Sequence, residues 1–114
     1  MAPDDFCYLT TTGRRTGKVR TVPLLHVADG DRLVLIASNW GRPSHPAWAL
    51  NLDAHREAYV ALDGMKRAYR ARRATPEEER RYWRDAVGFW PGYDDYRERA
   101  GREIRMFVLD PTGE

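Results

Sequence analysis

The chain is poor in cysteine and has no long apolar run. Cys7 is its only cysteine, so no disulfide can form within the chain, and a single thiol suits a reducing compartment. No segment approaches the roughly 18 consecutive apolar residues of a membrane-spanning helix. The opening residues MAPDDFCYLTTTG carry acids where a secretory signal has a basic region. We therefore expect a cytoplasmic protein with at most peripheral membrane contact.

Several catalytic patterns are also missing. The three histidines, His26, His45 and His55, have no cysteine or carboxylate at metal-ligand spacing, so we expect no metal site. The chain contains no Gly-x-Ser-x-Gly elbow, no P-loop and no Gly-x-Gly-x-x-Gly sequence. Cys7 has no support as a nucleophile and is interpreted as a small core residue.

Length and charge narrow the class of protein further. The 114 residues match the usual size of one domain, so residues 1–114 are expected to fold as a single unit. The 19 basic and 17 acidic residues leave a net charge of only +2, which does not describe a general polyanion binder. Dimerisation is compatible with so small a core but has no signature in the sequence.

One cluster of charge nevertheless stands out. The stretch TTTGRRTGKVRTVPL holds Arg14, Arg15, Lys18 and Arg20 around two glycines, with no acid among them. Glycine turns let backbone N–H groups approach an anion, and arginine pairs bidentately with phosphate or carboxylate. The stretch is therefore suited to an extended anionic ligand, although a solvated hairpin tip is an alternative of similar weight.

A second basic cluster lies later in the chain. It is compatible with the same groove, with a nucleic-acid surface or with a solvated strand edge protected against aggregation, and we favour the last of these. Its members are Lys66, Arg67, Arg70, Arg72 and Arg73.

Local patterns predict an antiparallel, strand-rich fold. Strands are expected at 6–11, 20–27, 32–38, 57–62, 66–74 and 104–111, with turns at 28–31 and 63–64 and with Pro23 indicating an edge or a bulge. A short helix is expected at 47–52 with Trp48 facing inward. This order lacks the alternation of a parallel sheet, so an α+β antiparallel barrel with a few helices is predicted.

The clearest helix start is at Thr75. Thr75 is a suitable N-cap, Pro76 suits the first helical position, and Glu78 completes a capping box. Tyr82, Trp83, Ala86 and Val87 then form an apolar stripe, and a shorter helix is expected from Asp94.

Four segments in this order resemble the deazaflavin-dependent nitroreductase family, whose members use coenzyme F420. They are LTTTGRRTGKVRTVPL, GDRLVLIASNWGRPSHPAWALNLDAH, ARRATPEEERRYWRDAV and PGYDDY, and the match runs from about Leu9 to Pro111. The resemblance implies a split β-barrel of the flavin-binding kind. It also implies hydride transfer from F420H2 to a quinone, a nitroaromatic or an activated alkene, with flavin mononucleotide a less suitable cofactor.

The resemblance implies roles for particular residues. The coenzyme's phosphate and oligoglutamate tail would contact Arg14, Arg15, Thr16, Lys18 and Arg20. Its ring would lie against Val22, Pro23, Leu24 and Leu25, with Ile36, Ala37, Ser38 and Asn39 at its edge and Ala47, Trp48 and Asn51 closing the pocket. The catalytic candidates are Ser38, Tyr93 and Tyr96, and the acceptor would contact Leu25, Trp90, Tyr93 and Tyr96.

Some positions depart from that family's pattern. Leu25 stands where nitroreductase-active relatives carry a tyrosine, and Trp90 stands where a tyrosine is also found, so the natural acceptor is left open. Besides an F420-dependent reductase, two alternative functions remain open. One is a non-catalytic binding module for F420, haem or a fatty acid, and the other is a basic nucleic-acid binder, which has no support beyond charge.

Overall fold

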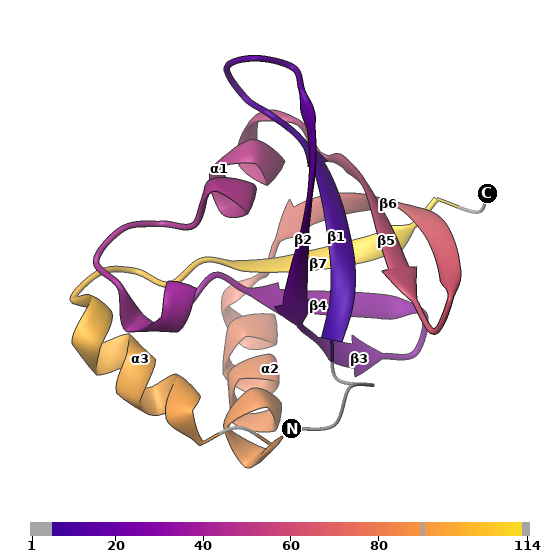
Figure 1. Ribbon diagram of the computed structural model, residues 1–114. Coiled ribbons are helices and arrows are strands. Elements are labelled where there is room, and N and C mark those ends of the chain that lie inside the picture. The colour runs from indigo at the N-terminus through magenta and orange to yellow at the C-terminus, as the bar shows by residue number, and fades with distance from the viewer. Residues whose placement is uncertain (1–5, 90, 113–114) are drawn as a thin grey trace.

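The computed structural model describes residues 6–89 and 91–112, with the side chains of these residues apart from Trp40, Phe89, Tyr96 and Arg97. Seven antiparallel strands form one sheet in the order β2-β1-β5-β6-β7-β4-β3, curled into a half-barrel (Figure 1). The strands are β1 (Phe6–Thr12), β2 (Val19–Leu25), β3 (Val27–Asp29), β4 (Arg32–Ile36), β5 (Glu57–Leu62), β6 (Met65–Arg73) and β7 (Met106–Pro111). The helices are η2 (Asn39–Gly41), α1 (Ala47–Ala54), α2 (Pro76–Phe89) and α3 (Gly92–Ala100).

The single strand predicted at residues 20–27 is wrong. β2 pairs with β1 at one edge of the sheet, whereas β3 pairs with β4 at the opposite edge. The chain leaves one edge at His26 and joins the other directly, which a curled sheet permits because its two edges approach each other. The edge position indicated by Pro23 is confirmed, since β2 is an edge strand.

Two strands, β4 and β7, separate two apolar cores. Successive side chains of a strand point to opposite faces, so a strand that is buried throughout contributes to both sides. Leu33, Leu35 and Phe107 face the interior of the half-barrel, while Val34 and Val108 pack against the helices. Cys7 is fully buried in the interior core, as predicted, and burial raises the pKa of its thiol to about 12.

The predicted capping box at the start of α2 is present. The Glu78 N–H donates to Thr75 Oγ1 at 3.2 Å, and the Thr75 N–H donates to Glu78 Oε1 at 2.9 Å. Tyr82 and Ala86 are buried against β4 and β7, which confirms the apolar stripe.

The predicted hairpin between β5 and β6 is also confirmed. Asp63 and Gly64 have φ values of 53° and 78°. A two-residue type I′ hairpin turn requires this left-handed backbone conformation at both of its central residues. The helix predicted at 47–52 extends to Ala54, and Trp48 is buried as expected.

The second basic cluster lies on β6, which is an inner strand of the sheet, so the predicted strand edge is wrong. Three of its arginines form ion pairs: Arg70 with Glu57, Arg72 with Glu78 and Asp110, and Arg73 with Asp53 and Glu103. Lys66 and Arg67 lie over the rings of Tyr59 and Tyr69. The cluster thus has local partners in the fold.

In the part of the chain described above, no helix has the length and apolar character needed to cross a membrane.

Candidate functional site

The hairpin of β1 and β2 projects beyond the rest of the sheet and carries the basic turn, residues 13–20 (Figure 1). The Gly13 N–H donates to the Lys18 carbonyl at 2.8 Å, and the Gly17 N–H donates to the Gly13 carbonyl at 2.9 Å. Gly17 has a φ of 73°, which strongly favours glycine. Thr16 Oγ1 accepts a hydrogen bond from the Lys18 N–H at 3.2 Å. The turn is therefore ordered by its own backbone.

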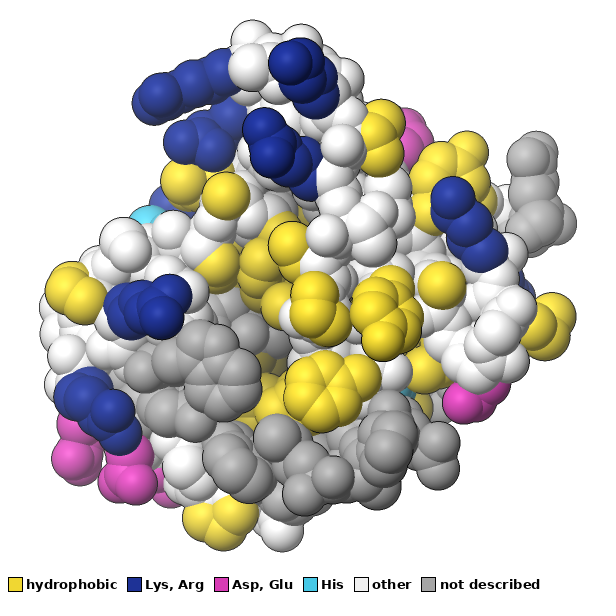
Figure 2. All heavy atoms as spheres, viewed as in Figure 1, with side chains coloured by type: hydrophobic (Ala, Val, Ile, Leu, Met, Phe, Trp, Pro, Cys, Tyr) yellow, Lys and Arg dark blue, Asp and Glu magenta, His cyan; other side chains and the backbone are white. Residues whose placement is uncertain are grey.

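The cations of the basic turn have no acidic partner within the described residues. Arg14, Arg15, Lys18 and Arg20 are all exposed, and none forms an ion pair with a described carboxylate, unlike the paired arginines of β6. Figure 2 shows Lys and Arg side chains gathered over the projecting hairpin, with apolar side chains around a hollow below it. Unpaired charge beside a hollow is available to an anionic ligand.

Two hollows lie beside the turn. The outer hollow, with a volume of about 330 Å³, is lined by Thr11, Gly13, Arg14, Arg15, Thr16, Arg20, Val22, Ala47, Trp48 and Asn51. The inner hollow, of about 90 Å³, is lined by Phe6, Pro23, Leu24, Leu25, Ile36, Ser38, Asn39, Pro46, Trp48 and Tyr93. Trp48 lines both, so the cationic end and the apolar end adjoin at this residue.

The fold brings most of the predicted cofactor residues to these hollows. Two predicted residues line neither: Lys18 is exposed at the turn, and Ala37 is fully buried in the interior core. Sequence reasoning missed four lining residues, Phe6, Thr11, Gly13 and Pro46. Phe6 and Thr11 belong to the strand that pairs with β2. The predicted hairpin could therefore have indicated that they lie beside the cofactor residues of β2.

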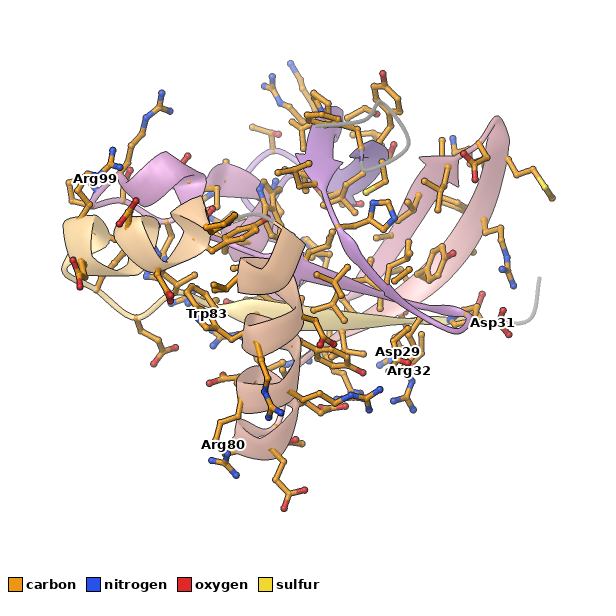
Figure 3. The ribbon with its side chains drawn as sticks, turned by 90° about the horizontal axis from the view of Figure 1, so that it is seen from below. Asp29, Asp31, Arg32, Arg80, Trp83 and Arg99 are labelled. Atoms are coloured by element: carbon orange, nitrogen blue, oxygen red, sulfur yellow. The ribbon has the colours of Figure 1, made fainter. Side chains whose placement is uncertain are left out.

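Tyr93, from α3, lines the inner hollow. It is buried, and its ring meets that of Trp83 edge-on, with 6.0 Å between ring centroids. Figure 3 shows Trp83 on the side of α2 that faces α3, and its indole N–H donates to Asp94 Oδ1 at 2.9 Å. Trp90 and the side chain of Tyr96 lie outside the described residues.

Helix α1 carries Trp48 and is anchored near both of its ends. The Trp48 ring meets Phe107 edge-on at 5.9 Å between centroids. At the other end of the helix, Asp53 accepts from Arg73 at 2.8 Å and 2.9 Å and from Arg105 at 2.6 Å. The hydrogen bonds from Arg73 hold the pKa of Asp53 below its usual value. The floor of both hollows is therefore fixed by packing and by an ion-pair network.

Ser38 is one of the polar residues that line the inner hollow. It is 9% exposed, and its hydroxyl has no hydrogen-bond partner among the described residues, so it is free to bond a ligand. The next residue, Asn39, has a φ of 49°, and its side-chain amide donates to the Ser44 carbonyl at 3.0 Å. That bond closes a short loop between β4 and α1.

The model of the F420H(2)-dependent quinone reductase family matches residues 1–111. The chain belongs to this family. A named relative, the F420H(2)-dependent quinone reductase Rv1261c of Mycobacterium tuberculosis strain ATCC 25618 / H37Rv, is 28% identical over 109 residues, which cover 89% of this chain and 70% of that protein. Family membership makes the chain an oxidoreductase whose coenzyme is F420, as the resemblance implied.

Solved structures agree with the F420H(2)-dependent family and with its fold. An F420-H2 dependent reductase, FDR-A, is 32% identical and superposes with a TM-score of 0.84 over 93% of this chain and 94% of that one. A structure described as a domain-swapped dimer, also 32% identical, has a TM-score of 0.85 over 93% of this chain and 80% of that one. The predicted antiparallel split barrel is confirmed.

The residues present fit the F420 coenzyme. Its phosphodiester and carboxylates require unpaired cations, which the basic turn supplies, and its planar ring requires an apolar slot with few polar groups. Trp48, Leu24 and Ile36 provide apolar walls in the inner hollow, and the Ser38 hydroxyl provides a hydrogen-bonding group. Charge and shape therefore change along the surface in the same order as along the coenzyme.

Proposed function

We propose that the chain reduces quinones with F420H2, binding the coenzyme's anionic tail at the basic turn and its ring in the inner hollow. The observation that supports the proposal is the spatial order of charged, aromatic and apolar side chains along the two hollows. Arg14, Arg15 and Arg20 lie at one end, Trp48 lies between, and an apolar slot with Ser38 lies at the other. A ligand that is anionic at one end and planar at the other is complementary to this arrangement.

The reaction balances with two reactants. Bound F420H2 supplies a hydride and releases a proton as it becomes oxidised F420. The quinone gains that hydride and one proton and leaves as a hydroquinone. The protein's part is to position the reactants, exclude water and stabilise the charge that develops on the quinone oxygen.

Within this proposal, Ser38 donates a hydrogen bond at the reacting end of the slot. Ser38 is only 9% exposed as a residue, so competition from water for this bond is limited. Leu25 and Tyr93 line the same hollow and contact the quinone, with Trp90 and Tyr96 proposed from sequence to complete that wall. Tyr93 and Tyr96 supply or relay the proton that accompanies the hydride.

A titration tests the proposal directly. Purified protein is titrated with oxidised F420, flavin mononucleotide and duplex DNA, and oxidation of F420H2 is followed with a quinone present. We expect the tightest binding with F420, because the basic turn offers more cations than one phosphate requires, together with quinone-dependent oxidation. Equal or tighter binding of flavin mononucleotide would contradict the assignment of the tail site. Binding of F420 without turnover would support a non-catalytic binding module instead.

We also propose that the chain forms a homodimer. The support is the 32% identical structure described as a domain-swapped dimer. Light scattering during size-exclusion chromatography measures the mass in solution, and we expect twice the 13.2 kDa of one chain. A mass equal to one chain at micromolar concentration would contradict a stable dimer.

A further inference from the structure

Arg102 lies in the segment between α3 and β7, against the loop of residues 37–46 that joins β4 to α1. Its guanidinium donates to this loop at three places. Nη2 donates to the carbonyls of Ala37 and Ser38 at 3.3 Å and 3.2 Å, and Nε donates to the carbonyl of Arg42 at 3.2 Å. Nη1 lies 3.4 Å from Nδ1 of His45. One side chain thus contacts the start, the middle and the end of the loop.

The partners of Arg102 differ from those of two other half-buried arginines. Arg72 and Arg105 both form ion pairs with carboxylates. Among the described residues, Arg102 forms no ion pair, and its remaining bond goes to the Glu103 carbonyl at 3.0 Å. Burial, followed by the charge of Arg105, lowers the pKa of Arg102. A partly desolvated cation held only by neutral acceptors is costly, so its position calls for a role beyond neutralising an acid.

His45 is compatible with this arrangement. Burial first, and then the charges of Arg105 and Arg102, lower the pKa of His45 below its usual value. A lowered pKa favours the neutral ring at pH 7, and a neutral ring leaves Nδ1 free to accept the Arg102 N–H. The end of the loop is therefore attached to the same guanidinium as its start.

The loop that Arg102 holds forms one wall of the inner hollow. Ser38, Asn39 and Pro46 all line that hollow, whereas Arg102 lines neither the inner nor the outer one. Within the loop, backbone hydrogen bonds join Gly41 to Ser38 at 2.9 Å and Arg42 to Asn39 at 3.1 Å, a single tight turn with few internal bonds. Contacts from outside the loop therefore help to hold Ser38 in place, both those from Arg102 and the hydrogen bond that the Ala37 N–H donates to the Arg105 carbonyl at 2.8 Å.

We propose that Arg102 is a positioning residue for hydride transfer. It holds the loop of residues 37–46 so that Ser38 and Pro46 face the reacting ring, and it acts through the loop without touching either reactant. This inference rests on the proposed function, in which the ring occupies the inner hollow. A misplacement of about 1 Å can cost on the order of a hundredfold in rate, so loss of the tie should lower turnover.

Two substitutions test the proposal. Arg102→Lys keeps the charge and the aliphatic stem, but its compact ammonium cannot bond the carbonyls of Arg42 and Ala37 together, and Arg102→Gln removes the charge as well. We expect kcat to fall by roughly 10- to 100-fold in both variants. The Kd for F420 should change less than about threefold, because the tail binds at the distant basic turn. The matched control is Arg70→Lys, which alters an ion-paired arginine of β6 that lines neither hollow.

Amide hydrogen exchange of the ligand-free protein gives a readout that does not depend on activity. Residues 37–46 should exchange faster in both Arg102 variants than in the parent, with α2 and β7 unchanged. A folded variant with parental kcat, or with parental exchange in the loop, would overturn the proposal. So would an equal loss of kcat in Arg70→Lys.

The proposal stays testable if neither Arg102 variant folds. The parent alone must then show protection at the amides of Gly41 and Arg42, and exchange there at the rate of an unstructured peptide would overturn it. A parent that oxidises no F420H2 with any quinone would contradict the proposed function, whereas the exchange comparison would still report whether Arg102 holds the loop.

Discussion

The side-chain oxygen of Asn51 accepts a hydrogen bond from the backbone N–H of Arg14 at 3.1 Å, which joins α1 to the tip of the β1–β2 hairpin. The other end of the same amide donates to Thr11 Oγ1 at 3.3 Å. Asn51 is 6% exposed, so both bonds are largely shielded from water. One amide therefore fixes the basic turn relative to Trp48, and the anionic end of the site is preorganised.

Replacing Asn51 by alanine is expected to weaken F420 binding. The Arg14 N–H and the Thr11 hydroxyl lose a partner, which costs about 1–3 kcal/mol, and the basic turn loses its attachment to α1. A fluorescence titration with F420 measures the change in Kd. The control is Thr21→Val, which removes the 2.8 Å hydrogen bond between Thr10 and Thr21 on the same pair of strands. Parental affinity in Asn51→Ala, or an equal loss in Thr21→Val, would show that this tie does not organise the site.

Neutralising the basic turn should weaken F420 binding in a salt-dependent manner. We expect Arg15→Ala and Lys18→Ala each to raise the Kd by about 2- to 5-fold at low salt, because exposed cations contribute modestly and are screened. The effect should shrink as salt is added. Arg67→Ala, an exposed cation over the Tyr69 ring on β6, serves as the control and should bind F420 like the parent. If both turn variants also match the parent at low salt, the turn is simply solvated.

The phenols of α3 are expected to act on the acceptor. Tyr93→Phe and Tyr96→Phe should leave the Kd for F420 nearly unchanged and lower kcat/KM for quinones by about tenfold or more, since each removes a group that can donate to the developing charge. Steady-state oxidation of F420H2 with several quinones measures the effect. Tyr59→Phe, an exposed tyrosine on β5, is the control. Parental kinetics in both variants would assign the proton to solvent, and a loss of F420 binding would place Tyr93 in the coenzyme site.

The stability of the fold should depend on Glu78 and on pH. Its carboxylate accepts two hydrogen bonds from Arg72, at 2.7 Å and 2.9 Å, and these lower its pKa from 4.5 to about 2. A pKa that is lower in the folded state stabilises the protein above pH 4.5, and that contribution is lost as the pH falls toward 2.

Glu78→Gln tests this dependence because glutamine can keep the capping box while losing the charge. We expect the variant to be less stable by about 1–2 kcal/mol at pH 7, a value discounted for solvent screening, and the difference to narrow at pH 3. Urea unfolding at both values measures it. Glu77→Gln, an exposed acid in the same helical turn, should show a smaller effect. A constant difference across this range would contradict the role of the ion pair.

Short-range patterns were sufficient for most of the local structure. The capping box of Thr75 and Glu78 and the turn of Asp63 and Gly64 depend on residues a few positions apart, whose backbone preferences act wherever the segment lies. Most of the buried strand predicted at 32–38 also follows from its own apolar residues, although the strand ends at Ile36. The basic turn could be found in the same way, because its glycines and cations are adjacent in the chain.

The break at His26 could not be found by such reasoning. Residues 20–27 have the composition of one strand, and only the curvature of the whole sheet assigns β2 and β3 to opposite edges. The inner position of β6 is another case, since its arginines resemble those of a solvated edge until the acids of other segments lie beside them.

The same distinction between local sequence patterns and long-range contacts applies to the functional site. Cations, apolar side chains and candidate hydroxyls were all recognisable from residue type and from the family resemblance. The contacts that orient them were not, because Asn51 lies 37 residues from Arg14 and Arg102 lies 64 residues from Ser38. Hydrogen bonds over such separations depend on the path of every intervening strand and helix, and a side chain's local sequence carries no information about that path.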